Sequence, residues 1–241
     1  MGIHGDDDWE IRVDQMKVGC VMLMSPGREA FQHQAVACYN SQTYTGGLRL
    51  LTLPAEPCAT IGAMRNYANS LLTDCDIVCH WDDDDWSHEN RIAEQVALLQ
   101  ATRADCVGYN EMLFWRGVEQ GPNYPGEAWL YSNPNPRYAL GTSLCYWRRA
   151  WEARPFQDIN HGEDTEWLKG LRCVGEEAGP IGLPDESSCW QPRMIARIHS
   201  GNSSSGYDPA EMARHNTLPR SERQWSRVPE WDKVCREVME R

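Results

Sequence analysis

The sequence of 241 residues has no apolar run approaching the roughly 20 residues that a membrane-spanning helix needs. Its first residues, MGIHGDDDWEIRVDQMK, are acidic and polar, and no basic stretch followed by an apolar one marks a secretory signal. Asp6 stands where an N-myristoylation signal has serine or threonine. The sequence therefore predicts a cytoplasmic protein without a transmembrane segment, with a loosely ordered lead-in over residues 1–16.

Cysteine spacings typical of zinc sites are also missing. The ten cysteines are scattered, with no Cys-x-x-Cys pair and no Cys/His ladder. Several of them lie inside apolar runs such as GCVML and SLCYW. Buried free thiols in a reducing compartment fit this distribution better than disulfides do.

Basic residues are few, with 23 Lys and Arg against 35 Asp and Glu, which gives a net charge of −12. A long stretch of nucleic acid is disfavoured as a partner, because phosphate neutralisation needs clustered cations. DNA binding would require a local basic patch, for which the candidates are Arg193, Arg197, Arg214 and Arg220. A bound divalent cation would offset part of the acidic charge locally.

Short apolar runs alternate with amphipathic segments in the first half of the chain. Strands are expected at 18–24, 48–53, 76–81, 106–109 and 112–115, and helices at 29–40, 63–72 and 89–102. Such alternation is typical of a largely parallel sheet with helices on both faces. The length suits one α/β domain with a small additional lobe.

The second half differs in composition. Residues 117–137 are rich in Gly, Pro and Asn, which predicts a loop with a short strand at 128–131. Further elements are expected as strands at 143–147 and, last, at 193–199, a turn of helix at 149–153, a helix from 163, and a C-terminal helix from 230. We divide the domain into a nucleotide-sugar half (17–115), an acceptor-side half (116–206) and a helical extension (207–241).

The segment HWDDDDW, residues 80–86, places four carboxylates directly after an apolar strand. In an open parallel sheet, ligands bind at the carboxyl ends of the strands. Adjacent carboxylates there are costly unless a cation holds them, and oxygen ligands suit Mg²⁺ or Mn²⁺. A solvated acidic loop, or a cap for the following helix, explains the spacing equally well.

Further motifs surround this cluster in a fixed order. They are Gln42–Tyr44 (QTY), Gly62–Ala68 (GAMRNYA), Asp76–Trp86, Glu89–Ile92, Gly141–Arg148 (GTSLCYWR) and Gly162–Thr165 (GEDT). Together they resemble the family 2 glycosyltransferases of the GT-A fold, over roughly residues 18–205. The resemblance implies a metal-dependent, inverting transfer of a sugar from a nucleotide-sugar to an acceptor hydroxyl.

The resemblance also implies roles for the acidic residues. Asp84 matches the metal-binding carboxylate, and Asp82 the carboxylate that contacts the donor ribose or the water shell of Mn²⁺ or Mg²⁺. Asp85 is expected to cap the next helix or to orient Asp84, and Asp83 to face solvent. His199, in the pattern His-Ser-Gly-Asn, matches a third metal ligand.

Asp164 matches the catalytic base that deprotonates the acceptor, with Glu163 as the second candidate. The donor-binding residues implied by the resemblance are Pro26, Arg28 and Arg65, together with Asp82 and Asp84. Trp86 and Trp129 are expected on the acceptor side, because aromatic faces stack on sugar C–H surfaces.

One departure concerns the donor base. The family carries an Asp after the second strand, whereas this sequence has Leu51–Glu56 there, with Glu56 as a substitute. A UDP-sugar is the first expectation and the base stays open. The acceptor should dock against the loops at 117–137 and 201–206.

The leading interpretation is thus an enzyme, a glycosyltransferase with a neutral or amphipathic hydroxyl acceptor. The alternatives are a non-catalytic nucleotide- or sugar-binding protein of the same fold, and a glycosyltransferase acting on hydroxymethylated bases in DNA. A nucleotidyltransferase is disfavoured, because Ser25–Arg28 is too short for a Gly-rich phosphate loop. The oligomeric state stays open.

Overall fold

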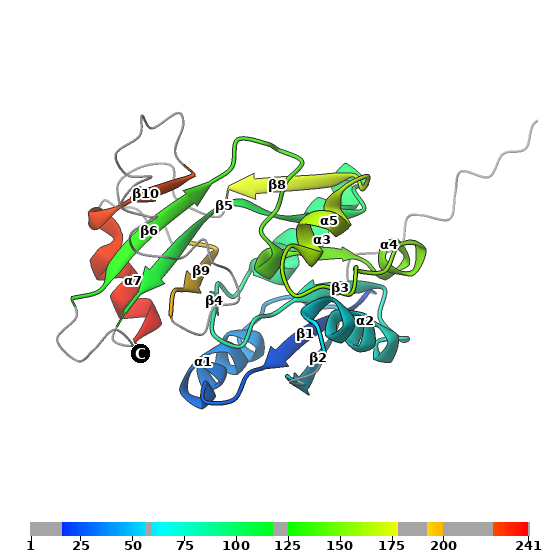
Figure 1. The fold of residues 1–241 in the computed structure, drawn as a ribbon, viewed down its shortest axis with the longest axis horizontal. Helices are drawn as coiled ribbons and strands as arrows, with labels where there is room; N and C mark the ends of the chain where they lie inside the picture. The colour runs from blue at the N-terminus through cyan, green and yellow to red at the C-terminus, as the bar shows by residue number, and fades with distance from the viewer. Residues whose placement is uncertain (1–15, 56–58, 118–124, 178–191, 200–223, 241) are drawn as a thin grey trace, which may run out of the picture.

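The computed structural model describes residues 16–55, 59–117, 125–177, 192–199 and 224–240. These residues form a mixed α/β domain around one twisted sheet with the strand order β10-β6-β5-β7-β3-β1-β2 (Figure 1). The strands are β1 (Lys17–Met24), β2 (Gly47–Pro54), β3 (Ile77–His80), β4 (Trp86–Ser87), β5 (Cys106–Arg116), β6 (Glu127–Ser132), β7 (Cys145–Trp147), β8 (Cys173–Glu177), β9 (Met194–Arg197) and β10 (Trp225–Arg227).

Parallel pairing dominates the half of the sheet that carries the acidic cluster. Strand β1 lies between β2 and β3 and pairs with both in parallel, and β5 pairs in parallel with β8 and β9. Strand β7 is antiparallel to β3 and β5, and β6 is antiparallel to β5 and β10. The carboxyl ends of β1 and β3 therefore meet at one edge, which confirms the predicted α/β fold with a mainly parallel sheet.

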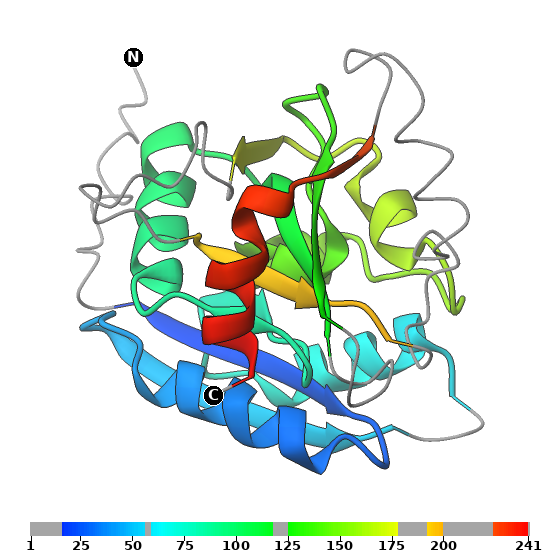
Figure 2. The ribbon, with the colours of Figure 1, turned by 90° about the vertical axis from the view of Figure 1, so that its left-hand side faces the viewer.

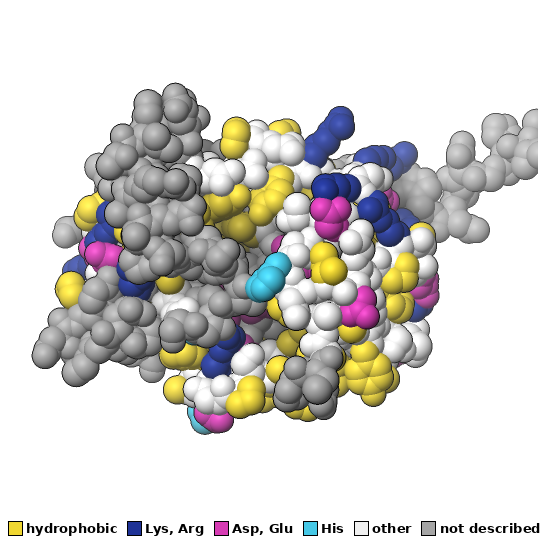
Figure 3. Space-filling model, in the orientation of Figure 1, with side chains coloured by type: hydrophobic (Ala, Val, Ile, Leu, Met, Phe, Trp, Pro, Cys, Tyr) yellow, Lys and Arg dark blue, Asp and Glu magenta, His cyan; other side chains and the backbone are white. Residues whose placement is uncertain are grey.

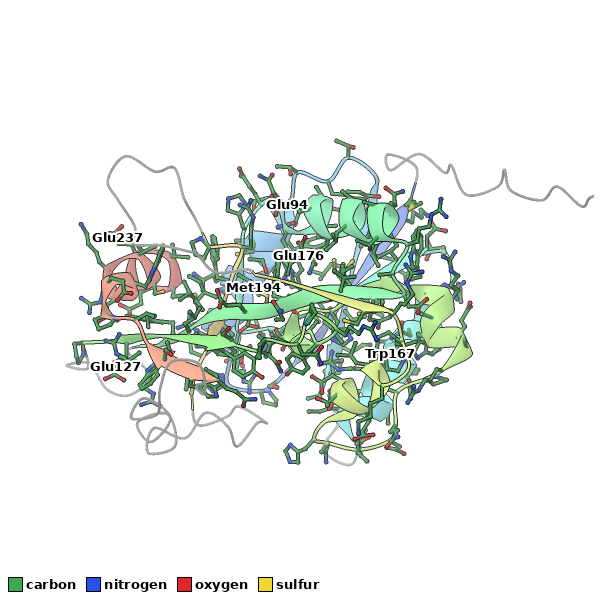
Figure 4. All side chains as sticks on the ribbon, turned by 90° about the horizontal axis from the view of Figure 1, so that it is seen from above. Glu94, Glu127, Trp167, Glu176, Met194 and Glu237 are labelled. Atoms are coloured by element: carbon green, nitrogen blue, oxygen red, sulfur yellow. The ribbon has the colours of Figure 1, made fainter. Side chains whose placement is uncertain are left out.

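Helices cover both faces of this sheet. They are α1 (Glu29–Asn40), α2 (Ile61–Leu71), α3 (Arg91–Thr102), α4 (Arg148–Ala153), α5 (Glu163–Leu168) and α7 (Asp232–Met239), with 3-10 turns η3 (Gly141–Ser143) and η6 (Pro229–Trp231). Figure 4 shows Glu94 of α3 and Trp167 of α5 on opposite sides of the sheet. The helix expected at 29–40 has these bounds in the structure.

Successive side chains of the buried strands point to opposite faces of the sheet and form two hydrophobic cores. On one face Cys20 and Cys79 pack with Ala35 of α1 and with the stripe Ile92, Val96 and Leu99 of α3. On the other face Val21 and Val78 pack with α2, α4 and α5. Fully burying such aliphatic side chains contributes about 1.5–3 kcal/mol each, so the core rigidly supports the strand ends that bear the site.

From residue 106 onward the structure departs from the expected elements. The two short strands expected at 106–109 and 112–115 are one strand, β5, because Asn110 and Glu111 lie at a bulge that keeps the chain in the sheet. The turn η3 replaces the start of the strand expected at 143–147. Strands β8 and β10 were not expected, so 193–199 does not hold the last strand.

The C-terminal helix α7 packs across the far end of the sheet, in front of β9 in Figure 2. Its buried Cys235 and Met239, with Trp231 of η6, lie against Leu113 and Trp115 of β5. The described residues contain no helix long and apolar enough to span a membrane. Within the same residues eight cysteines are free and buried, as the sequence predicts.

Candidate active site

A cleft of about 550 Å³ opens at the carboxyl ends of β1 and β3. Its lining includes Ser25, Arg28, Arg65, Thr142, Glu163 and Asp164, together with the acidic loop, Asp82–Asp85. Figure 3 shows a hollow near the middle of this face, with acidic side chains visible inside it. The position agrees with the place expected for a ligand in an open α/β sheet.

Three of the four carboxylates converge in this cleft. Asp82, Asp84 and Asp85 each offer an oxygen, and these atoms all lie within 4.8 Å of one another. Burial, and then the charges of Asp84 and Asp82, raise the pKa of Asp85 well above its ordinary value. Burial also raises the pKa of Asp82, against the opposing charge of Arg65. Burial and mutual repulsion disfavour the ionised form of these carboxylates, and a bound divalent cation would offset both effects. The three oxygen ligands therefore fit Mg²⁺ or Mn²⁺.

Asp84 sits between two cationic or potentially cationic groups. Its Oδ2 accepts from Arg28 Nη1 at 2.7 Å and lies 2.7 Å from His199 Nε2. The His199 ring packs 5.7 Å from the ring of Phe31 on α1. The structure thus brings His199 to the acidic loop from a point 115 residues away in the sequence, where the resemblance expects a third ligand.

Asp83 does not face solvent, and that expectation was wrong. Its side chain is 2 % exposed. It accepts hydrogen bonds from the Ser25 amide at 2.7 Å and from Arg28 Nη1 and Gln32 Nε2 at 3.0 Å each. These donors, which are buried or half-buried, come from the turn after β1 and from α1, and they hold the carboxylate inside the protein because an unpaired donor there would be costly. Asp83 therefore fixes the acidic loop to α1.

Asp85 fixes the other side of the loop. Its Oδ1 accepts from the Arg197 amide at 3.0 Å, and its Oδ2 accepts from Thr142 Oγ1 at 2.5 Å. It does not cap the following helix, because α3 begins at Arg91 with Asn90 as its N-cap. That alternative was wrong, and the contacts connect Asp85 to β9 and η3 instead.

Glu163 and Asp164 are adjacent at the start of α5 but have different surroundings. Glu163 is buried and bonded to Arg65 Nε at 3.1 Å, and burial raises the pKa of its carboxyl against the lowering by Arg65. Asp164 is half-buried and lines the cleft, with its Oδ1 accepting from the Thr165 amide at 2.7 Å. Both carboxylates line the cleft, and Asp164 is the more exposed of the two.

The expected donor-side residues are brought together only in part. Arg28 and Arg65 line the cleft, although each is also paired with a carboxylate. Pro26 is exposed at the turn after β1 and does not line the cleft, while its neighbour Ser25 does. Glu56 lies outside the described residues.

The expected acceptor-side tryptophans lie elsewhere. Trp129 is buried within β6, and Trp86 borders a groove between α1 and α7 rather than the central cleft. The aromatic side chains that do line the cleft are Phe114, Tyr131, Tyr138 and Trp225. Sequence reasoning missed Phe114 and Tyr131 because alternating aromatics in β5 and β6 look the same whether they fill a core or border a cleft.

The basic patch considered for DNA is not assembled among the described residues. Arg193 pairs with Glu94 on α3, and Arg197 is buried. Arg214, Arg220 and the loop at 201–206, which includes Asn202, lie outside the described residues.

Comparison with solved structures finds this fold in S. aureus TarS. The chain superposes on TarS with a TM-score of 0.51 and 11% identity, covering 86% of this chain and 41% of that one. It matches TarS 1-349 in complex with UDP at a TM-score of 0.51 and 11% identity, covering 86% of this chain and 68% of that one. For the complex with UDP-GlcNAc, the TM-score is 0.52 and the identity 11%, covering 84% and 65% of the two chains.

At this identity the likeness establishes the fold. The chain spans about two fifths of the length of TarS. No model of a protein family matches the sequence, and no curated protein matches it either.

Proposed function

We propose that this protein is a family 2 glycosyltransferase that uses Mn²⁺ or Mg²⁺ and moves a sugar from a nucleotide-sugar to an acceptor hydroxyl with inversion. The observation that carries the proposal is the convergence of Asp82, Asp84 and Asp85 in one cleft with Asp164. The TarS complexes with UDP and UDP-GlcNAc support a UDP-sugar as the donor. Residues 17–115 would supply most of the donor site and 116–206 the base and acceptor side.

The metal site is assigned to Asp84 and Asp82, with His199 as a further ligand. A cation bound there would neutralise charge that builds on the leaving diphosphate. Asp85 adds a third carboxylate to the set that the resemblance names. Arg28 and Arg65 add positive charge to the same cleft, where phosphate oxygens would lie.

The base is assigned to Asp164. A general base must reach the acceptor proton. Both carboxylates line the cleft, but Glu163 is buried and held by Arg65, while Asp164 is half-buried. We assign Glu163 to orienting Arg65. Inversion follows from direct displacement by the acceptor oxygen, with one base and no carboxylate acting as a nucleophile.

The test is incubation with a panel of UDP-, GDP-, CMP- and dTDP-sugars plus Mn²⁺. Donor hydrolysis is measured as the amount of free nucleotide that is released. Asp164→Asn should preserve donor binding and lower transfer by at least ~10²-fold, the usual scale for a positioned base. Glu163→Gln is the matched control at the adjacent carboxylate and should be the milder change. A larger loss for Glu163→Gln would reverse the two roles, and no donor turnover with any sugar would refute the function.

A non-catalytic binding protein of this fold is the competing function. It would bind UDP in a Mn²⁺-dependent manner but would turn over no donor, and Asp164→Asn would change nothing. The presence of a cleft-lining carboxylate beside the acidic loop favours the enzyme.

A further inference from the structure

The turn η3, Gly141–Ser143, lies between the two carboxylate groups of the proposed active site. Each of its three carbonyls meets a side chain from β3 or α3. The Gly141 carbonyl oxygen lies 2.6 Å from His80 Nδ1. Arg91 Nη2 donates to the Thr142 carbonyl at 3.2 Å, and Gln95 Nε2 donates to the Ser143 carbonyl at 2.8 Å.

These supporting side chains are almost completely buried, with exposures of 0 % for His80 and 1 % for Arg91 and Gln95. Arg91 also donates to the His80 carbonyl at 2.9 Å and to Ser87 Oγ at 2.9 Å, so it holds both ends of the segment that contains the acidic loop. Buried hydrogen bonds of this kind are expensive to break, because the orphaned group stays desolvated. The turn is therefore rigidly connected to the base of the acidic loop.

Thr142 connects the turn to the carboxylates above it. Its Oγ1 donates to Asp85 Oδ2 at 2.5 Å. Thr142 therefore holds one of the three clustered carboxylates directly.

Gly141 connects the turn to the Asp164 side chain. A Cβ at this glycine would lie 2.8 Å from Asp164 Cγ and 3.1 Å from Asp164 Cβ, and it would overlap Oδ2. A Cβ placed under 3.0 Å from another atom forces a shift, so a side chain at position 141 would displace the Asp164 carboxylate from its present place. A glycine is needed here for close approach and not for its backbone conformation.

We propose that η3 is a spacer that sets the separation between the cation-binding carboxylates and Asp164, with Thr142 and Gly141 as its positioning residues. The inference rests on the proposed function, because it gives the two carboxylate groups their roles as metal site and base. Its contacts are properties of this chain and can be measured without a donor or an acceptor.

The Gly141 contact is tested by a double-mutant cycle on stability. Gly141→Ala should lower Tm by about 2–4 °C, the shift for a loss of 1 kcal/mol in a chain of this size. In an Asp164→Ala background the same substitution should lower Tm far less, because the overlapping carboxylate is gone. Gly19→Ala, which also meets a side chain (Leu72) in the core but lies in β1, should lower Tm equally with and without Asp164. If the Tm changes of Gly141→Ala and Asp164→Ala are additive, the spacer role of Gly141 is refuted.

The Thr142 contact is tested by a Mn²⁺ titration. Binding is measured as the decrease in the electron paramagnetic resonance signal of free Mn²⁺. Thr142→Val keeps the shape but removes the hydroxyl and should weaken Mn²⁺ binding about 10–100-fold, the range for lost partners of metal ligands. Thr142→Ser should restore most of the affinity. Equal affinity in the valine variant, or no Mn²⁺ binding by the unmodified chain, would overturn the role of Thr142.

The two experiments separate this inference from the proposed function. If Gly141→Ala and Asp164→Ala are not coupled but the protein turns over a donor, the spacer role is refuted and the proposed function stands. If the coupling and the hydroxyl-dependent Mn²⁺ binding are found without any donor turnover, the spacer role stands and the proposed function is refuted.

Discussion

Proton linkage at His80 tests the buried network beneath the proposed site. Its Nδ1 faces the Gly141 carbonyl, which only accepts, so Nδ1 carries the hydrogen of the neutral ring. Its Nε2 lies 3.4 Å from the Tyr146 hydroxyl, which also lies 3.3 Å from Asn69 Oδ1. Burial, and then the charge of Arg65, hold the pKa of His80 well below the ordinary value of 6.5.

The sign of the effect follows from this depressed pKa. Below pH 6.5 the unfolded chain binds a proton at His80 and the folded chain does not. Acidification therefore stabilises the unfolded state relative to the folded one. The stability contributed by the neutral ring is complete above pH 6.5 and is lost as the pH falls toward the folded pKa. One proton is worth about 1.4 kcal/mol per pH unit, which makes about 2 kcal/mol between pH 6.5 and 5. That is a large part of a typical stability of about 5–15 kcal/mol.

The assay is urea unfolding between pH 7.5 and 5 for the unmodified chain, His80→Asn and Tyr146→Phe. Asparagine can still donate to the Gly141 carbonyl but does not titrate, so His80→Asn should lose about 2 kcal/mol less on acidification. Tyr146→Phe keeps the buried imidazole and should retain the steep loss. The raised pKa values of Asp82 and Asp85 oppose the trend equally in all three proteins. Parallel pH curves for His80→Asn and the unmodified chain would refute the assigned proton state.

Two further substitutions test other supports of the site. Arg197 Nη2 donates to both Gln34 Oε1 and the Met239 carbonyl, so Arg197→Lys should loosen the C-terminal end of α7 and speed its amide hydrogen exchange. Unchanged amide exchange in α7 would contradict this. Gly162 precedes α5 with φ of 75° and open space around it, so Gly162→Ala should cost about 1–2 kcal/mol through backbone strain alone. Urea unfolding of Gly162→Ala that matches the unmodified chain would contradict that cost.

Much of the fold could be predicted because its signals are local. The stripe of Ile92, Val96 and Leu99 marks α3, and the apolar residues before Asp82 mark β3. Strand β8 carries Gly175 and two glutamates, so its place beside β5 comes from pairing and not from its own sequence. Predictions failed where distant pairing outweighs local composition.

The candidate site shows the same division. The resemblance selected Asp84, Asp164 and His199, and the structure places all three at the cleft or the acidic loop. It assigned no role to Gly141 or Thr142, although their motif was noticed. A glycine and a threonine are common in turns, and only the folded chain shows which carboxylates they contact.

Four consecutive aspartates are indistinguishable by spacing, so their partners must separate their roles. Asp83 is held by three donors from one side of the loop, while Asp82, Asp84 and Asp85 converge on the other. Asp83→Asn keeps the volume but removes the charge and turns an NH₂ group toward donors. It should therefore cost about 1.5–3 kcal/mol of unfolding free energy, the scale for hydrogen bonds to a charged group.

Asp84→Asn is the matched control for Asp83→Asn, one residue along the chain. It removes a clustered oxygen ligand, so it should abolish Mn²⁺-enhanced nucleotide binding. It should also lower stability, because Asp84 accepts from Arg28 and lies 2.7 Å from His199 Nε2. Asp83→Asn should lower stability but largely keep Mn²⁺ binding, because its carboxylate is absent from the cluster. Urea unfolding and a Mn²⁺ titration on both variants separate the two roles. Loss of Mn²⁺ binding in a fully stable Asp83→Asn variant would mean that the cation sits on the α1 side of the loop and that Asp83, not Asp84, holds it.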